Sequence, residues 1–273
     1  MSLVLFALVL FPGFEKLSAQ NLTTSPYSRY GIGDLVSRST GRSQAMGGLS
    51  CGLRSNHNLN LLNPASLVGI DSQDFIFEMG AFERVTSFET TNQQRTVNNL
   101  GFSYVALGFP ITKWLKASVG IVPMSNVGYS MNVVEESPIM GTVNYDYEGS
   151  GGISQFFISG SVSPNQYLSL GATFSYDFGP VDHSRSLSIS ADSGYFSTQV
   201  IQSAIVGDIN FSYGAQVNIP LNDNKFITLG GTFQNQSTLN ATSRTTIIAT
   251  GTSLTDTLSY IEDPNNSVIL PMG

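Results

Sequence analysis

The chain has 273 residues, of which 11% are charged, less than half of the roughly 25% typical of soluble domains. Its net charge of −7 and the absence of a basic stripe argue against nucleic acid as a partner, and its single cysteine excludes an internal disulfide. Few charges, 27 glycines and an 11% share of aromatic residues are typical of a sheet with one apolar and one wet face.

The first element is an apolar run over residues 3–14, followed by Leu17-Ser18-Ala19. Small or apolar residues at this spacing fit a signal-peptidase site, so residues 1–20 are predicted to be a signal peptide. No Lys or Arg precedes the run, which leaves a buried element of the mature fold as the alternative. Beyond residue 20 no apolar run approaches the roughly 20 residues of a membrane-spanning helix, so any membrane crossing must use strands.

Residues 21–72 do not alternate and are rich in Gly, Ser, Asn and Arg. A segment of this length ahead of a barrel predicts a hatch or plug that fills the lumen, with a floppy periplasmic tail as the alternative. Residues 43–46 predict a short helical turn that stops at Gly47 and Gly48, and these glycines are predicted hinges. Six leucines of the hatch either form an apolar ligand path or merely seat the plug: Leu49, Leu53, Leu59, Leu61, Leu62 and Leu67.

From residue 73 the sequence alternates between apolar and polar side chains with period two. Within residues 168–178 every apolar residue is even-numbered and the polar residues are odd-numbered, which is a strong strand signal. Leu170, Phe174, Phe211, Val217, Leu229 and Phe233 are therefore predicted to face lipid, and Ser169, Thr173, Asn210, Gln216 and Thr232 to face the lumen. The predicted strands cover 73–89, 96–109, 113–132, 152–163, 166–190, 196–219 and 225–248, and an eighth begins near 268–270.

Turns and loops alternate along this region. Tight turns are predicted at 110–113, 164–166 and 220–224, and long polar loops at 133–151, 180–200 and 240–266. This asymmetry favours an outer-membrane barrel over a soluble sandwich. The predicted fold is therefore all-β, an antiparallel up-and-down transmembrane β-barrel over residues 73–273, located in the cell outer membrane and in contact with its lipid.

Three short elements precede the alternating region in order: 25–35 (Ser-Pro-Tyr to Gly-Asp-Leu), Ala45-Met46-Gly47-Gly48 and Asn63-Pro64-Ala65-Ser66. This order resembles the start of FadL/TodX-type outer-membrane proteins in their divergent branch. The resemblance implies a hatch, with Asn63, Pro64 and Ala65 as one of its elements, a barrel of roughly 14 strands and hydrophobic small molecules as ligands. It covers about 8 of those strands, and the chain ends without a terminal aromatic residue, so we expect the C-terminal strands to be missing.

Sequence signals for chemistry are few. No His, Cys, Asp or Glu spacing fits a metal site and no phosphate-binding loop is present, so no metal or other cofactor is expected. His183 with Ser184 and Ser186 hints at a lipid hydrolase, but parity turns His183 toward the lumen, and no enzyme is predicted. The first predicted function is passive transport of hydrophobic small molecules. The alternative is a non-transport barrel that scaffolds a secretion or surface-attachment complex with other envelope proteins.

Overall fold

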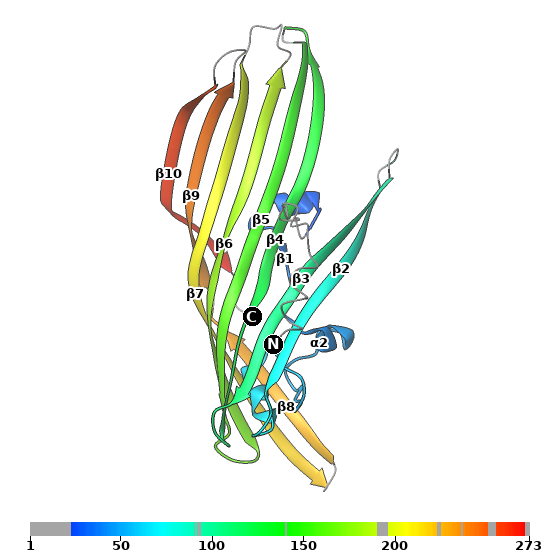
Figure 1. The fold of residues 1–273 in the computed structure, drawn as a ribbon, viewed down its shortest axis with the longest axis vertical. Helices are drawn as coiled ribbons and strands as arrows, with labels where there is room; N and C mark the ends of the chain where they lie inside the picture. The colour runs from blue at the N-terminus through cyan, green and yellow to red at the C-terminus, as the bar shows by residue number, and fades with distance from the viewer. Residues whose placement is uncertain are drawn as a thin grey trace, which may run out of the picture.

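The protein is described by a computed structural model that covers residues 23–89, 91, 94–139, 141–189, 196–222, 225–235, 237–250 and 255–270. The predicted signal peptide at 1–20 lies outside the described residues. Within these residues ten antiparallel strands form one curved sheet, in the spatial order β10-β9-β7-β6-β5-β4-β3-β2, with β1 beside β4 and β8 beside β7 (Figure 1). The predicted all-β antiparallel meander is confirmed, and the described strands form an open wall of the kind found in a barrel.

The elements fall into a short irregular N-terminal part and a long-stranded wall. None of the helices among the described residues is long and apolar enough to cross a membrane. In chain order the elements are η1 (Pro26–Arg29), β1 (Asp34–Leu35), α2 (Gly41–Ala45), η2 (Pro64–Gly69), β2 (Ile76–Glu89), β3 (Gln94–Pro110), β4 (Leu115–Ser137), β5 (Gly141–Val162), β6 (Leu168–Ile189), β7 (Ser197–Asn222), β8 (Lys225–Gln234), β9 (Ser237–Thr250) and β10 (Thr255–Leu270).

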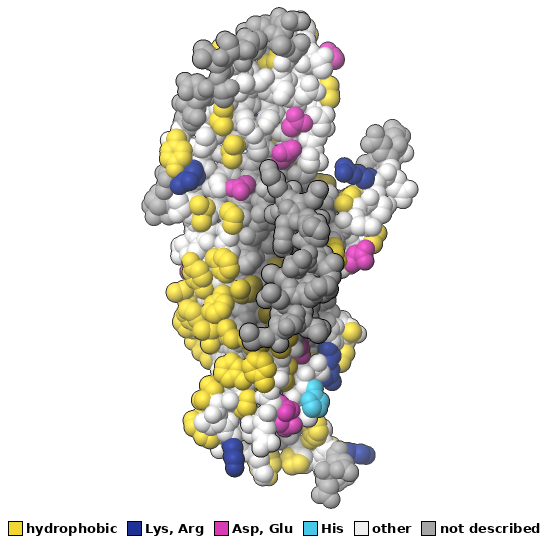
Figure 2. Space-filling model, viewed as in Figure 1, with side chains coloured by type: hydrophobic (Ala, Val, Ile, Leu, Met, Phe, Trp, Pro, Cys, Tyr) yellow, Lys and Arg dark blue, Asp and Glu magenta, His cyan; other side chains and the backbone are white. Residues whose placement is uncertain are grey.

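The two faces of β6 and β7 differ as the alternation predicts. On β6, Ser169 is 0% exposed on the inner face, whereas Phe174 is 37% exposed on the outer face. The same division holds on β7, where Asn210 and Gln216 are buried and Phe211 and Val217 are exposed. Figure 2 shows the outward hydrophobic side chains gathered over the lower half of the strands, with fewer on the upper half. Such an apolar band is the surface that a barrel turns toward lipid.

The connections predicted to share one end of the sheet do so. The β3–β4, β5–β6 and β7–β8 turns all lie at the lower end in Figure 1. From β2 onward consecutive strands pair with each other, except that β8 and β9 both pair with β7, one after the other, and β1 pairs with β4. Residues 225–248, predicted as one strand, therefore form two strands that lie in line along the same neighbour.

The long loops predicted at 133–151, 180–200 and 240–266 are largely wrong. β4 and β5 pair from Leu115↔Val162 up to Ser137↔Gly141, with one irregularity between Pro123 and Ser125, and β9 and β10 occupy most of 237–270. The eighth strand also begins at Thr255, well before 268–270. The polar residues that suggested loops lie on one face of paired strands: on β5, Asn144, Asp146 and Glu148 alternate with Val143, Tyr145 and Tyr147. The wall therefore rises above the apolar band as paired strands.

Residues 23–72, here named the N-terminal segment, lie against the inner face of the wall. Leu59, Leu67 and Ile70 of this segment are buried together with wall residues. The full cluster is Leu59, Leu67, Ile70, Ile76, Tyr104, Ala106, Val122 and Phe157. A second cluster higher on the wall centres on Val127, Ile153 and Val181, and Ile32 of the segment packs against it.

Candidate functional site

The contact between the N-terminal segment and the wall centres on the Asn63-Pro64-Ala65 motif. Asn63 is 0% exposed and begins the η2 helix, where its Oδ1 accepts a hydrogen bond from the Ala65 backbone N–H (3.1 Å). Its Nδ2 donates to the Cys51 carbonyl oxygen (2.7 Å). One side chain thus caps the helix and holds two parts of the segment together, and proline at the first helical position stiffens the same turn.

Three wall glycines, Gly171, Gly214 and Gly230, form a flat surface beneath this motif that we name the glycine seat. A Cβ atom at Gly171 would lie 2.5 Å from both the Ala65 nitrogen and the Pro64 carbonyl carbon. A Cβ at Gly214 would fall on Asn63 Oδ1, and one at Gly230 on the Cys51 carbonyl oxygen. The motif therefore approaches the wall backbone more closely than any residue with a side chain would allow.

Polar side chains around the glycine seat bind the backbone of the segment. Ser161 donates to the Ala65 carbonyl oxygen (3.2 Å), and Gln216 donates to the carbonyl oxygen of Cys51 (2.8 Å). In the opposite direction, Arg54 of the segment donates to Ser169 Oγ (2.6 Å). Ser161, Ser169 and Gln216 are all buried inner-face residues, so these bonds satisfy groups that would otherwise be costly to bury.

A second anchor is a buried polar network around Arg38. Its guanidinium donates to Gln155 Oε1 on β5 (2.7 Å) and to Gln234 Oε1 on β8 (3.1 Å). Gln155 in turn donates to Asp177 Oδ1 on β6 (2.6 Å), and Asn210 on β7 donates to the other oxygen of that carboxylate. The network therefore joins the segment to four strands.

The network also balances charge. Burial lowers the pKa of the Arg38 guanidinium and the nearby Asp177 carboxylate raises it, but an arginine in a protein stays protonated. Asp177 is fully buried, and Arg38 supplies its nearby opposite charge. A buried charge is stable when it is paired and hydrogen-bonded, so Arg38 and Asp177 depend on each other.

The six leucines predicted as a ligand path or seat occupy two separate places. Leu59 and Leu67 are at most 2% exposed in the apolar cluster, and Leu61 packs against it. Leu49 is 65% exposed and, with Leu53, lines a groove of about 450 Å³ formed by residues 46–53. Leu62 is partly buried. The six leucines therefore do not line one continuous apolar path in the described part of the chain.

Gly47 and Gly48 end the short helix that the sequence predicts at 43–46. Both have positive φ, +75° and +83°, and the Gly48 N–H donates to the Ser43 carbonyl oxygen (2.8 Å). Left-handed residues of this kind close helix C-termini, and glycine adopts them without strain. The predicted hinge role of the two glycines stays a prediction.

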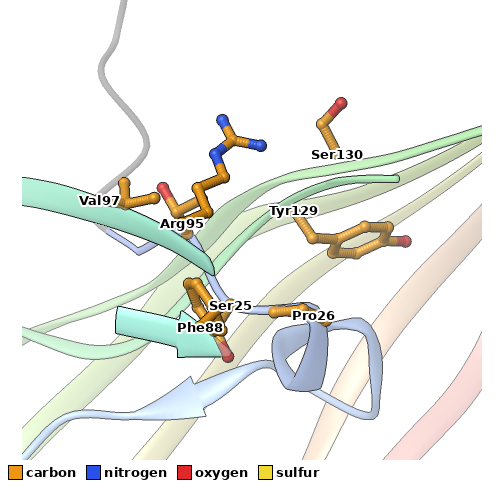
Figure 3. A pocket seen from close by; sticks show the side chains of 8 residues that line it. Ser25, Pro26, Phe88, Arg95, Val97, Tyr129 and Ser130 are labelled. Carbon is orange, nitrogen blue, oxygen red and sulfur yellow. The ribbon is translucent and has the colours of Figure 1, made fainter. Parts of the chain in front are cut away.

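A cleft separates β3 from the upper part of β4. The two strands pair only from Val105↔Ile121 to Pro110↔Lys116, and above this point β1 pairs with Ser125 and Asn126 instead. Figure 3 shows the resulting pocket, of about 180 Å³, between the β2–β3 hairpin, β4 and the start of the segment. Its lining residues are Thr24, Ser25, Pro26, Phe88, Arg95, Val97, Tyr129 and Ser130.

His183 faces inward, as parity predicts, and its Nδ1 lies 2.8 Å from the Tyr129 hydroxyl. Arg185, two positions further along β6, lies on the same face as His183. Ser184 instead accepts a hydrogen bond from Gln199 (3.0 Å). His183 and its neighbouring serines therefore do not form the pair that a hydrolase would need.

The Asn63-Pro64-Ala65 element is recognisable in the sequence, but its partners on the wall were not predicted. Asp177 is the one carboxylate on the inward parity of 168–178, and a lone inward charge requires a partner. Gly171 and Gly214 also occupy inward positions, where a missing side chain marks a close backbone approach. The inward carboxylate and the inward glycines could therefore have been recognised from the sequence. No local feature of the sequence connects Arg38 to the network.

A family model described as BamG matches residues 1–269. No curated protein and no solved structure matches the chain significantly.

The match overturns the FadL/TodX resemblance, because BamG is a different family. Elements such as 45–48 and 63–66 carry helix caps and left-handed glycines, which compact irregular segments require for conformational reasons alone. Their order is therefore not specific to one barrel family. The BamG match and the β-barrel type of fold together indicate the outer membrane. Because the matched region spans nearly the whole sequence, the chain belongs to the BamG family.

Proposed function

We propose that this chain is a non-transporting outer-membrane barrel that acts as a scaffold in an envelope machine. The family name points to the barrel-assembly machinery as that machine. The observation that carries the proposal is the attachment of the N-terminal segment, which contacts the inner face of the wall through buried bonds on several strands. A segment attached to the interior by many buried bonds suits a structural part better than a path for solutes.

The bonds are distributed over the wall. Lys116 on β4 donates to Ser72 Oγ (3.2 Å), Ser161 on β5 and Gln216 on β7 bind the segment backbone, and Gln234 on β8 accepts from Arg38. Leaving one buried partner unsatisfied costs about 1–3 kcal/mol. A gate would have to break many of these bonds at once without a second arrangement to replace them, whereas switching elements have two comparable packings.

The upper wall offers surface for partners. β4 and β5 extend as a paired hairpin up to Ser137 and Gly141, beyond the band of outward apolar side chains. Exposed residues on this extension include Glu135 and Glu136 beside Val133 and Val134, so it offers a mixed polar and apolar surface for contact with other envelope proteins. We infer that other envelope proteins, rather than small hydrophobic molecules, are the main partners.

Two measurements on the full-length protein in its native membrane test the proposal. A tagged copy at native abundance should co-purify with the central barrel of the assembly machinery, while an equally abundant unrelated barrel protein should not. Depletion of the protein should lower the amounts of other barrel proteins in the outer membrane. In liposomes the purified protein should leave hydrophobic-compound uptake at the level of empty vesicles. Uptake well above that level, without association with the machinery, would contradict the scaffold proposal and support transport as the function.

A further inference from the structure

A cavity of about 350 Å³ lies beside the second apolar cluster, between the start of the N-terminal segment and strands β4 to β7. Its lining residues are Arg29, Tyr129, Tyr147, His183, Ser184, Arg185, Val200 and Gln202. This volume lies at the lower end of the range of small-molecule sites. The cavity differs from the glycine seat because cationic and aromatic side chains dominate it.

Two arginines from different parts of the chain converge on one tyrosine ring. The Arg29 guanidinium carbon, from η1, lies 4.8 Å from the centroid of the Tyr147 ring, and that of Arg185, from β6, lies 5.5 Å from it. Tyr147 and Arg185 are also direct register partners on β5 and β6. Stacking on an aromatic face orients a guanidinium plane while its N–H groups stay available at the edge.

The strand register separates the two signs of charge here. Tyr147 and Gly149 pair with Arg185 and His183, so these four share the inner face with Arg29. Asp146, Glu148 and Asp182 alternate with them on the other face, where Asp182 accepts a hydrogen bond from Ser203. Glu148 and Asp182 line a different cavity.

The cavity therefore carries positive charge that the described residues leave uncompensated. Its lining contains no carboxylate, and neither Arg29 nor Arg185 forms an ion pair with a described acidic residue. This is notable in a chain whose net charge is −7. Two unpaired guanidinium groups that flank one cavity form a binding arrangement for an oxyanion, which they can contact through paired N–H groups.

We propose that this cavity binds a phosphate group carried by a small molecule or by a lipid headgroup. Arg29 and Arg185 supply the charge, and the Gln202 amide supplies a neutral donor at the wall. Because Arg29 belongs to the N-terminal segment and Arg185 to the wall, a bound phosphate bridges the two and holds them together. The proposal stands apart from the scaffold function, since it concerns a ligand of the cavity and makes no use of a protein partner.

Binding to the full-length protein in neutral detergent tests the proposal. The probes are inorganic phosphate, glycerol 3-phosphate and short-chain phosphatidic acid in mixed micelles, with the matching diacylglycerol as the phosphate-free control. Calorimetry should give saturable binding of at least one phosphate probe and none of diacylglycerol. Binding of the soluble phosphates identifies a free anion as the source, and binding of phosphatidic acid alone identifies a lipid headgroup.

Variants assign the binding to the cavity. Arg29→Gln and Arg185→Gln should each weaken binding at least tenfold, because each removes one charged fork. Arg84→Gln is the matched control: Arg84 lies 5.6 Å from the Phe82 ring in a similar stacked contact but lines none of the cavities described above, so binding should not change. Arg185→Lys serves if the glutamine variant fails to fold, and loss of the planar fork should still weaken binding several-fold. Absence of saturable phosphate binding, or equal binding by wild type and both cavity variants, would refute the site.

Discussion

Gly171 on β6 and Gly214 on β7 are direct register partners, and both lie beneath the turn formed by Asn63, Pro64 and Ala65. Two paired glycines remove every side-chain atom from one spot on the inner face of the wall. The turn of the N-terminal segment occupies that spot and touches the wall backbone. The turn can lie this close only because both wall residues are glycines. Substitutions at these two positions therefore test directly how the segment is held.

We predict that Gly171→Ala displaces the turn and destabilises the protein by about 1–3 kcal/mol, the usual cost of overpacking. The added Cβ would meet backbone atoms of Pro64 and Ala65 at 2.5 Å, and backbone cannot move aside as a flexible side chain can. Urea unfolding in detergent and trypsin cleavage within the segment measure the effect. Gly160→Ala on β5 is the control, because nothing lies within 4 Å of its Cβ. Equal stability of the two variants would argue against a tight seat.

Asn63→Ala should loosen the segment from within. The substitution removes a cap to the Ala65 N–H and a bond to the Cys51 carbonyl oxygen, both at a fully buried position. A loss of about 1–3 kcal/mol in the free energy of unfolding is expected, because buried polar groups are left without partners. Asn56→Ala, at an exposed position of the same segment, should change stability by less than about 0.5 kcal/mol. Denaturant titration of the two variants side by side decides the matter.

The Arg38 network predicts a measurable coupling between two residues that do not touch. Asp177→Asn places an amide against the donors of Gln155 and Asn210 and removes the charge nearest to Arg38. Arg38→Gln removes the other charge. Each single variant should destabilise the protein, and the double variant should be more stable than the sum of the two losses implies, with a coupling energy of about 0.5–3 kcal/mol. Additive losses in a double-mutant cycle would show that the two charges act independently.

The sequence predicts the lower wall well and the upper wall poorly, for one physical reason. Around Phe174 and Phe211 one face meets lipid and the other the interior, so polarity alternates and both strand and face can be predicted. In the hairpin that ends at Ser137 and Gly141 the outer face carries Asn144, Asp146 and Glu148 instead of apolar side chains. A polar loop was therefore predicted there, although Tyr145 and Tyr147 alternate with these residues as in a strand.

The candidate site was predicted in part, because its two halves carry different kinds of signal. Asn63-Pro64-Ala65 is a local cap motif that can be recognised from adjacent residues. The contacts of Arg38 with Gln155 and Gln234 join residues that are distant in sequence, so they emerge only when the strands pair and the segment docks. The FadL/TodX resemblance was wrong for a related reason. It rested on short turn motifs, which reflect local conformation and do not distinguish one barrel family from another.

Arginine at position 174 or 211 should test which face meets lipid. Phe174 and Phe211 are register partners on the outer face, with their rings edge to face at 5.6 Å. A charge near the middle of a bilayer costs about 2–4 kcal/mol in a barrel wall, so Phe174→Arg and Phe211→Arg should lower stability in lipid by that amount. Val134→Arg on the upper part of β4 makes a similar change at an exposed position outside the band and should have little effect. Unfolding in lipid vesicles measures all three, and similar losses at 134 and 174 would mean that the apolar band is misplaced.

Substitutions of leucines in the N-terminal segment distinguish a structural role from a role in a ligand path. Leu59 and Leu67 are buried in one cluster with Val122 and Phe157, so Leu59→Ala and Leu67→Ala should each cost about 2–5 kcal/mol of unfolding free energy. Leu49 is exposed, and Leu49→Ala should stay within about 0.5 kcal/mol of wild type. If the leucines instead line a path, Leu49→Ala should alter uptake of a hydrophobic dye into liposomes while leaving stability intact. We expect no such change, because Leu49 and the buried pair occupy separate places on the segment. Dye uptake by wild-type protein above the level of empty vesicles, lowered in stable Leu49→Ala protein, would therefore contradict the scaffold function directly.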